Sequence, residues 1–109
     1  MTNAVLTLPT TQSVTGISDH DVLSPFLAGQ LTPQTRRAYH ADLVAFFGGD
    51  LISLDDCRSI TFVDVIAYRN KLSDDGLKPA TINRKLSSIR ALYKVLMAAG
   101  ALPTNPADA

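Results

Sequence analysis

The sequence predicts an all-α protein with four helices in a single domain. Apolar residues recur at helical spacing, helix-starting and helix-ending residues bracket each such segment, and no strand-like alternation of useful length occurs. The 109 residues suffice for one domain, and a composition that is 46% hydrophobic but only 6% aromatic indicates a core of aliphatic side chains. We therefore expect one compact helical domain without internal repeats.

Both ends of the chain are expected to lie outside this domain. Residues 1–17 carry no charged side chain and contain Pro9 and Gly16, which predicts a mobile N-terminal arm. Residues 18–102 would form the helical domain, and residues 103–109, with two prolines, have the composition of a linker that leaves it. The chain shows neither a signal-peptide pattern nor an apolar run of membrane-spanning length, so we expect a cytoplasmic protein without membrane contact.

The first helix is expected over about residues 18–30. Ser18 or Asp19 is a suitable N-cap, and apolar residues follow at helical spacing. Pro25 conflicts with this course, because proline in a helix interior removes a hydrogen bond and clashes with the preceding turn.

The second helix has stronger boundary signals. Thr32 is a favourable N-cap and Pro33 a favourable first helical residue, because proline presets the backbone angle and lacks an amide hydrogen that would have no partner. Gly48 and Gly49 end the helix near position 47. Its apolar side consists of Tyr39, Leu43, Phe46 and Phe47.

Residues 50–60 have the character of a loop with room for one short helical turn. Thr61 and Asp64 then form a pattern close to a capping box, with Asp in place of the usual Glu or Gln, and Gly76 ends the third helix. Its core positions are Val65, Ile66 and Leu72.

The fourth helix, from about Pro79 to Ala99, is the most informative segment. Between Lys78 and Lys94 it carries five basic residues and no acidic one. At about 100° per residue, Ile82, Leu86, Ile89, Tyr93 and Leu96 form a core stripe. The opposite, exposed side is expected to hold Ala80, Arg84, Ser87, Ser88 and Ala91. Small residues let a helix approach a surface, and longer polar ones can reach phosphates or base edges, so this side predicts a polyanion as partner.

The charge is segregated although the chain as a whole is neutral. The sequence has 10 basic and 10 acidic residues, every acid an Asp. Seven Asp lie between Asp42 and Asp75, whereas the block from Lys78 to Lys94 has none. We therefore expect one face that attracts phosphate and another that repels it.

Metal, cofactor and nucleophilic roles are not expected. The lone Cys57 has no partner for a disulfide and no neighbours for a zinc site, which favours a reducing, intracellular setting. His40 lacks a second ligand at metal spacing, and His20 lies near the expected mobile arm. The three tyrosines, Tyr39, Tyr68 and Tyr93, fall at core-facing or packing positions without the cationic cluster that a nucleophile attacking phosphate needs.

The order and spacing of a longer set of residues carry a family resemblance. This set comprises Thr35, Tyr39, Phe46, Ile60-Thr61, Asp64-Val65, Tyr68, Gly76-Leu77, Thr81-Ile82-Asn83-Arg84, Leu86-Ser87, Arg90, Leu92-Tyr93 and Asn105-Pro106. Over about residues 20–109 it resembles the N-terminal core-binding domain of tyrosine recombinases, the phage-integrase and Xer-like enzymes. No single short motif is diagnostic, but the combination is fairly specific.

The resemblance implies a SAM-like, four-helix orthogonal bundle. Such a domain forms one half of a clamp around double-stranded DNA, with two helices facing the major groove. A C-terminal catalytic domain with Arg, Lys, His and a nucleophilic Tyr forms the other half. The resemblance further implies that this fragment alone catalyses nothing, and that the parent cuts and rejoins DNA through a covalent tyrosine intermediate. That parent would use no metal or nucleotide cofactor and would work as a homotetramer on paired sites.

By position, the resemblance places the DNA contacts on the outer sides of the second and fourth helices. The candidate DNA-binding residues are Thr35, Arg36, Arg37, Lys78, Ala80, Thr81, Arg84, Lys85 and Ser88, beside the small residues Ala38 and Ala41. Lys78 departs from the family pattern, in which many relatives have a Ser or Thr cap, and this leaves the start of the fourth helix open.

Two alternatives stay open at this stage. The basic residues could form an ordinary solvated face. Arg36 or Arg37 could also pair with Asp42 or another surface acid, an exposed pair of that kind being worth only about 0 to 1 kcal/mol. The chain could also be a helical protein-interaction module that binds an acidic protein. Salt-dependent binding to double-stranded DNA separates these functions.

Overall fold

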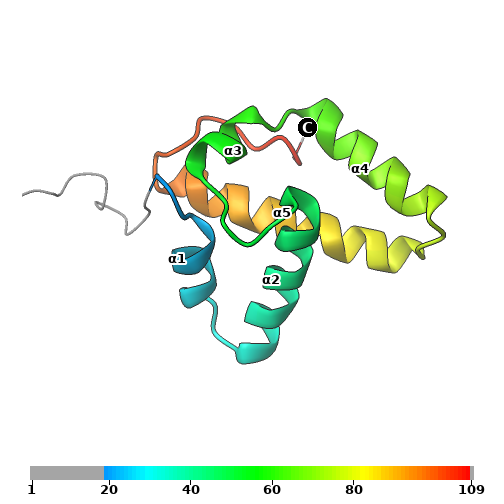
Figure 1. The fold of residues 1–109 in the computed structure, drawn as a ribbon, viewed down its shortest axis with the longest axis horizontal. Helices are drawn as coiled ribbons and strands as arrows, with labels where there is room; N and C mark the ends of the chain where they lie inside the picture. Colours follow the sequence, from blue (N-terminus) through cyan, green and yellow to red (C-terminus); the bar gives the residue numbers. More distant parts are fainter. Residues whose placement is uncertain (1–18, 109) are drawn as a thin grey trace, which may run out of the picture.

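The structure, a computed structural model, describes residues 19–108, and in this range the chain is all-helical as predicted (Figure 1). It contains five helices rather than four: α1 (Leu23–Ala28), α2 (Pro33–Phe47), α3 (Leu54–Ser59), α4 (Phe62–Asp74) and α5 (Pro79–Ala98). The predicted arm of residues 1–17 lies outside the described residues. No helix in the described part is both long and apolar enough to cross a membrane.

Helix α1 is shorter than predicted because it begins after its capping carboxylate. One side-chain oxygen of Asp21 accepts hydrogen bonds from the backbone amides of Leu23 (3.0 Å) and Ser24 (3.1 Å). This start places Pro25 in the first turn, where proline is tolerated. The conflict that Pro25 posed for a helix over residues 18–30 therefore disappears.

Helix α2 has the predicted boundaries. Thr32 Oγ1 accepts from the backbone amide of Thr35 at 3.1 Å, and Pro33 is the first helical residue. Gly48 ends the helix with a left-handed backbone (φ 84°), a conformation in which a residue with a side chain is strained.

Helix α3 was not predicted beyond a possible turn, and it begins with a capping box. The Ser53 hydroxyl accepts from the Asp56 amide (3.0 Å), while the Asp56 carboxylate accepts from the Ser53 amide (2.9 Å). Helix α4 uses the same device, because Thr61 and Asp64 exchange the corresponding bonds at 3.2 Å and 2.8 Å. The capping box predicted for this helix is confirmed, with Asp as the reciprocal partner.

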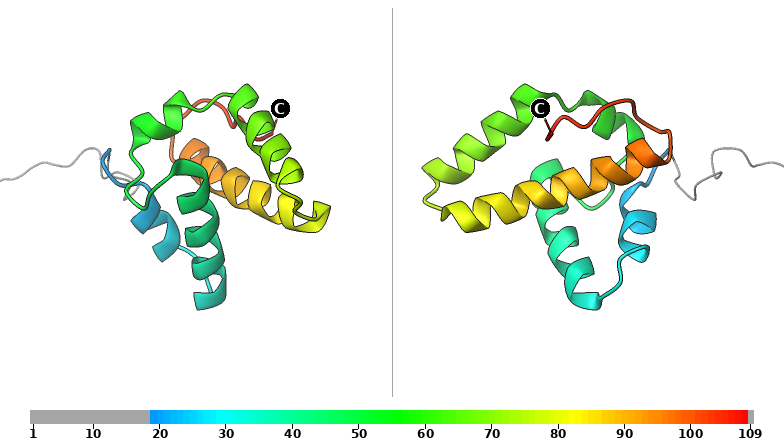
Figure 2. Two further views of the ribbon diagram at one scale, coloured as in Figure 1. Left: turned by 45° about the vertical axis from the view of Figure 1, so that its right-hand side comes forward. Right: turned by 180° about the vertical axis from the view of Figure 1, so that it is seen from behind.

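Helix α5 is the central element, because α2 packs against one of its sides and α4 against another. In Figures 1 and 2, α5 runs back along α4 after a tight turn, whereas α2 crosses α5 steeply and α1 lies beside α2. All five predicted core positions of α5 are buried, and Ser88 and Leu92 are buried as well. Its buried arc is therefore wider than a single apolar stripe.

The segment after α5 packs back onto the domain, where a departing linker was expected. Leu102, Asn105 and Ala107 are buried. The Asn105 amide donates to the Arg90 carbonyl (3.2 Å), and its oxygen accepts from the Ala107 amide (3.0 Å). A single side chain thus satisfies backbone groups on α5 and in the final segment, which fixes that segment against the helix.

Tyr93 gives the first test of this packing. Its buried hydroxyl donates to the carbonyl of Cys57 at 2.7 Å and so links α5 to α3. We expect Tyr93→Phe to lower the free energy of unfolding by about 1 kcal/mol, since it removes one buried hydrogen bond and little volume. Urea unfolding followed by circular dichroism measures the change.

Tyr39→Phe is the matched control for this prediction. Tyr39 is half-buried and stacks on Phe26 with ring centroids 5.4 Å apart, and the described residues provide no hydrogen-bond partner for its hydroxyl. Its substitution should leave the unfolding midpoint nearly unchanged. An equal loss in both variants would contradict the role given to the Tyr93 hydroxyl.

Candidate nucleic-acid interface

The exposed side of α5 combines small and cationic side chains. Lys94, Arg84 and Asn83 are exposed, Ala91 is half-buried, and no acidic residue occurs anywhere in the helix. Ala80 and Ser87 are small and exposed. We call the set Ala80, Asn83, Arg84, Ser87, Ala91 and Lys94 the open face of α5. This face is centred near Ser87 and contains four of the five residues that the sequence predicted for the exposed side.

Ser88 does not lie on this face, and the prediction that it would is wrong. Ser88 is only 1% exposed, and its hydroxyl donates to an oxygen of Asp42 at 2.6 Å. Ser88 is buried because α2 packs against the side of α5 that the sequence predicted to be exposed. Ser88 therefore cannot place its hydroxyl in a nucleic-acid groove.

Asp42 is the centre of a polar cluster that joins α2 to α5. Its side chain is 1% exposed, and it receives Arg84 Nη1 at 2.6 Å, Ser88 Oγ at 2.6 Å and, more loosely, Lys85 Nζ at 3.4 Å. The side chain of Arg84 remains 51% exposed, whereas that of Lys85 is 20% exposed. The alternative that Asp42 pairs with Arg36 or Arg37 is therefore wrong.

Sequence reasoning missed this cluster although a signal was present. Asp42 lies three residues after Tyr39 and four before Phe46, so it shares the core-facing side of α2 with both rings. A charged residue at a core position needs a partner, because burial of an unpaired charge is strongly unfavourable. The surplus of basic residues in α5 provides that partner.

The candidate residues of α2 differ in how free they are to bind a ligand. Arg36 is half-buried and donates from Nη1 to the carbonyl of Gln30 at 2.8 Å, which ties the α1–α2 connection to α2. The Thr35 hydroxyl accepts from the hydroxyl of Thr32 at 2.9 Å. Arg37 is exposed and forms no ion pair with any described residue. It is therefore the most available cation of this helix.

The N-terminus of α5 offers a further cationic position. Lys78 occupies the N-cap without a side-chain hydrogen bond to the helix, and it is exposed. Ala80 is exposed and Thr81 half-buried in the first turn. Unpaired amides at a helix start carry partial positive charge, so they reinforce the charge of Lys78.

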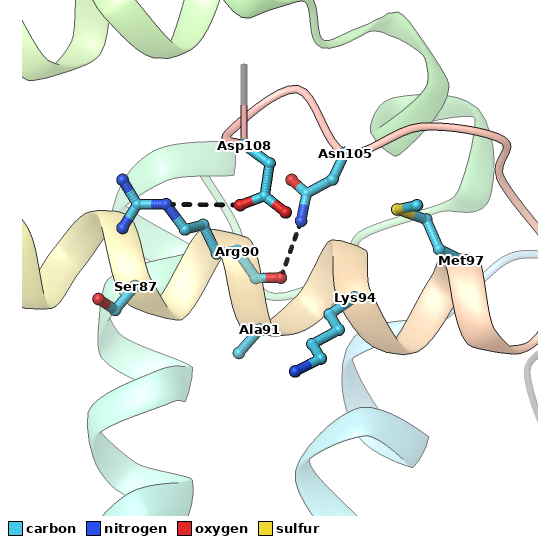
Figure 3. Close-up of a pocket in the computed structure, with 7 residues that line it drawn as sticks. All are labelled: Ser87, Arg90, Ala91, Lys94, Met97, Asn105 and Asp108. Atoms are coloured by element: carbon cyan, nitrogen blue, oxygen red, sulfur yellow. Dashed lines mark hydrogen bonds and ion pairs between the residues drawn. The ribbon is translucent and has the colours of Figure 1, made fainter.

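A pocket of about 570 Å³ lies between the second half of α5 and the final segment (Figure 3). Arg90 crosses it, donating from Nε to the Ala107 carbonyl at 3.1 Å and lying 3.8 Å from an Asp108 oxygen. Lys94 points away from this segment and has no acidic partner among the described residues. Lys78 and Lys94 thus leave their charge uncompensated at the two ends of the basic stretch.

Tyr93 and Cys57 are buried and Tyr68 is half-buried, so none of these three side chains is freely exposed. Tyr93 is buried and burial raises its pKa, while burial together with the Asp56 carboxylate raises the pKa of Cys57 to about 12. Tyr68 is half-buried against the ring of Phe46, and its pKa is also raised, mainly by burial. No group of three potential metal ligands forms among residues 19–108.

Comparisons with known proteins identify similar chains. The family model "Phage integrase, N-terminal SAM-like domain" matches residues 26–100. Tyrosine recombinase XerC of Chlorobaculum parvum is 30% identical over 105 residues, covering 81% of this chain and 31% of the relative. A tyrosine recombinase of Synechococcus elongatus is 31% identical over 106 residues, covering 86% of this chain and 32% of the relative.

A further relative extends this similarity. XerC of Xanthomonas campestris is 32% identical over 99 residues, covering 80% of this chain and 29% of the relative. The chain thus spans about a third of the length of these curated relatives. No solved structure gives a significant match.

The neighbouring serines of α5 test the geometry of the interface. We expect Ser88→Ala to lower the free energy of unfolding by about 1 to 2 kcal/mol, because it removes a 2.6 Å hydrogen bond to a buried carboxylate. Ser87→Ala should change it by less than about 0.5 kcal/mol, because Ser87 is exposed. Urea unfolding of both variants measures the difference, and a reversed order would refute the assignment of the buried face.

Proposed function

The chain belongs to the phage-integrase N-terminal SAM-like domain family, and from this premise we propose that it is the DNA-binding half of a tyrosine site-specific recombinase. In this proposal α2 and α5 contact double-stranded DNA at the recombination site, and the bound DNA takes part in integration or recombination. The observation that carries the proposal is the open face of α5, on which small residues alternate with cations and which has no acidic side chain.

The open face has the properties that a major groove requires of a helix. The small residues Ala80, Ser87 and Ala91 would allow the backbone of α5 to come close to the base edges. Arg84 would read bases, since its planar group can donate two parallel hydrogen bonds to guanine. This assignment favours a role in sequence preference for Arg84, which is half-exposed although Asp42 holds one of its nitrogens.

The flanking cations would hold the phosphates. Lys78 at the start of α5 and Lys94 in its second half lie at opposite ends of the open face, and Arg37 provides an exposed charge on α2. Phosphate contacts of this kind fix the orientation of a protein on the duplex without reading sequence. Thr35, Arg36, Thr81 and Lys85 are half-buried, so we assign them supporting positions at the edge of the contact. Ser88 is removed from the set because it is buried.

The proposal extends to the protein of which this chain would be a part. A following catalytic domain would complete a clamp around the duplex and supply the tyrosine nucleophile. Four such proteins would assemble on paired sites, and the reaction would need neither metal nor nucleotide. These statements rest on family membership and on the greater length of the relatives.

Binding to double-stranded DNA is the direct test. If the chain neutralises about four phosphates, the logarithm of its association constant should fall against the logarithm of salt concentration with a slope of about −4. Fluorescence anisotropy of a labelled mixed-sequence duplex, titrated at several salt concentrations, gives this slope. A folded chain that binds no duplex at about 50 mM salt would refute the proposal and favour the interaction with an acidic protein.

Two substitutions on α5 separate the proposed roles. Arg84→Ala should reduce the discrimination among duplexes of different sequence, by about 1 to 3 kcal/mol where the arginine reads a base. Lys78→Ala should weaken binding to all duplexes alike and make the salt slope shallower by about one unit. Anisotropy titrations on a panel of duplexes measure both effects. Equal losses on every sequence for both variants would contradict the division into a reading and a phosphate-binding residue.

A further inference from the structure

We infer that Asp42 is a positioning residue for DNA recognition, which fixes the direction of Arg84 and limits its charge. This inference rests on the proposed function. Asp42 itself is buried and would not touch the duplex. It would act through Arg84, whose side chain is part of the open face of α5, and secondarily through Lys85.

The orientation of the Arg84 side chain depends on that of the Asp42 carboxylate. Ser88 donates to the same carboxylate oxygen as Arg84, each at 2.6 Å, while Lys85 lies 3.4 Å from the other oxygen. Because Ser88 and Asp42 are both buried, this carboxylate cannot rotate freely. The Arg84 guanidinium is consequently held by one terminal nitrogen, and its exposed remainder extends in a defined direction.

An arginine that is held in this way binds differently from a free one. A solvated arginine loses rotational freedom when it binds, whereas a side chain that is already ordered loses less and meets base edges in a fixed geometry. The same carboxylate partly cancels the positive charge that would attract any phosphate. Asp42 should therefore raise discrimination among duplexes while it lowers the non-specific affinity.

A purely structural role for Asp42 would have different consequences. A buried charged cluster contributes little net stability compared with apolar residues of similar size, so stability alone gives a weak reason for a carboxylate at this position. In that case removal of its charge would alter unfolding and leave the DNA selectivity of the folded protein unchanged. The two roles are therefore distinguished by measurements of binding and not by stability.

Asp42→Asn in the 109-residue chain tests the inference, because asparagine keeps the shape and removes the charge. Selection of a random duplex pool on the wild-type chain provides one enriched duplex, and a scrambled version of it provides the reference. We expect the variant to show a salt slope steeper by about one unit, since Arg84 becomes available to one more phosphate. The affinity ratio of enriched to scrambled duplex should fall by about tenfold or more, as for the loss of an oriented base contact.

Asp55→Asn is the matched control. Asp55 is exposed on α3 and pairs with Arg58 at 2.8 Å, so this substitution makes the same change in net charge and also breaks an arginine ion pair. It should leave the affinity ratio unchanged. The inference would be overturned if both variants changed the salt slope and the affinity ratio equally. It would also be overturned if a folded Asp42→Asn chain changed neither the salt slope nor the affinity ratio.

Ser88→Ala provides a second route if Asp42→Asn does not fold. This substitution keeps the charge of Asp42 but removes the hydroxyl that fixes its carboxylate. We expect an unchanged salt slope and a several-fold lower affinity ratio, whereas an unchanged ratio would overturn the inference. Wild-type chain that binds no duplex, or enriches none, would instead refute the proposed function, so the two failures are distinguishable.

Discussion

A buried carboxylate joins the two helices on which the proposed interface depends. Asp42 lies inside the contact between α2 and α5, and the position is tolerable only because α5 supplies two cations and a hydroxyl to it. Apolar packing alone specifies the contact weakly, whereas a short hydrogen bond to a single buried oxygen requires one relative position of the helices. The placement of Arg84 on the open face therefore follows from the packing of the core.

The same central position of α5 decides which of its side chains remain available. With α2 on one side, α4 on another and the final segment over its second half, α5 retains only a narrow open face. Asn105 matters in this respect, because its hydrogen bonds to Arg90 and Ala107 hold the final segment against the helix. Arg90 is consequently bonded to Ala107 and paired with Asp108 in the final segment. In the second half of α5, Lys94 is the basic residue without an ion pair to a described residue.

Local signals in the sequence predicted the boundaries of α2 and the start of α4, but not which side chains are buried. Thr32 with Pro33, and Thr61 with Asp64, determine helix starts through bonds within a few residues, so they could be recognised without the fold. The exposure of Ser88 depends on which neighbour covers its side of α5, and no local pattern contains that information. A serine at that position suits either water or a buried carboxylate, so its role became definite only with Asp42 beside it.

The neutral total charge is compatible with a nucleic-acid interface because the acids neutralise particular cations. Arg58 pairs with Asp55 within α3, and Lys71 of α4 pairs with Asp75, the C-cap of that helix. The basic residues without an ionic partner in the described range are Arg36, Arg37, Arg69, Lys78 and Lys94. Two of these lie at the ends of the basic stretch of α5, and Arg69 lines a surface hollow with Asn83 of the open face. Attraction of a polyanion depends on the local field at such a surface rather than on the net charge of the chain, so the unpaired Lys78 and Lys94 can attract phosphate although the total charge is zero.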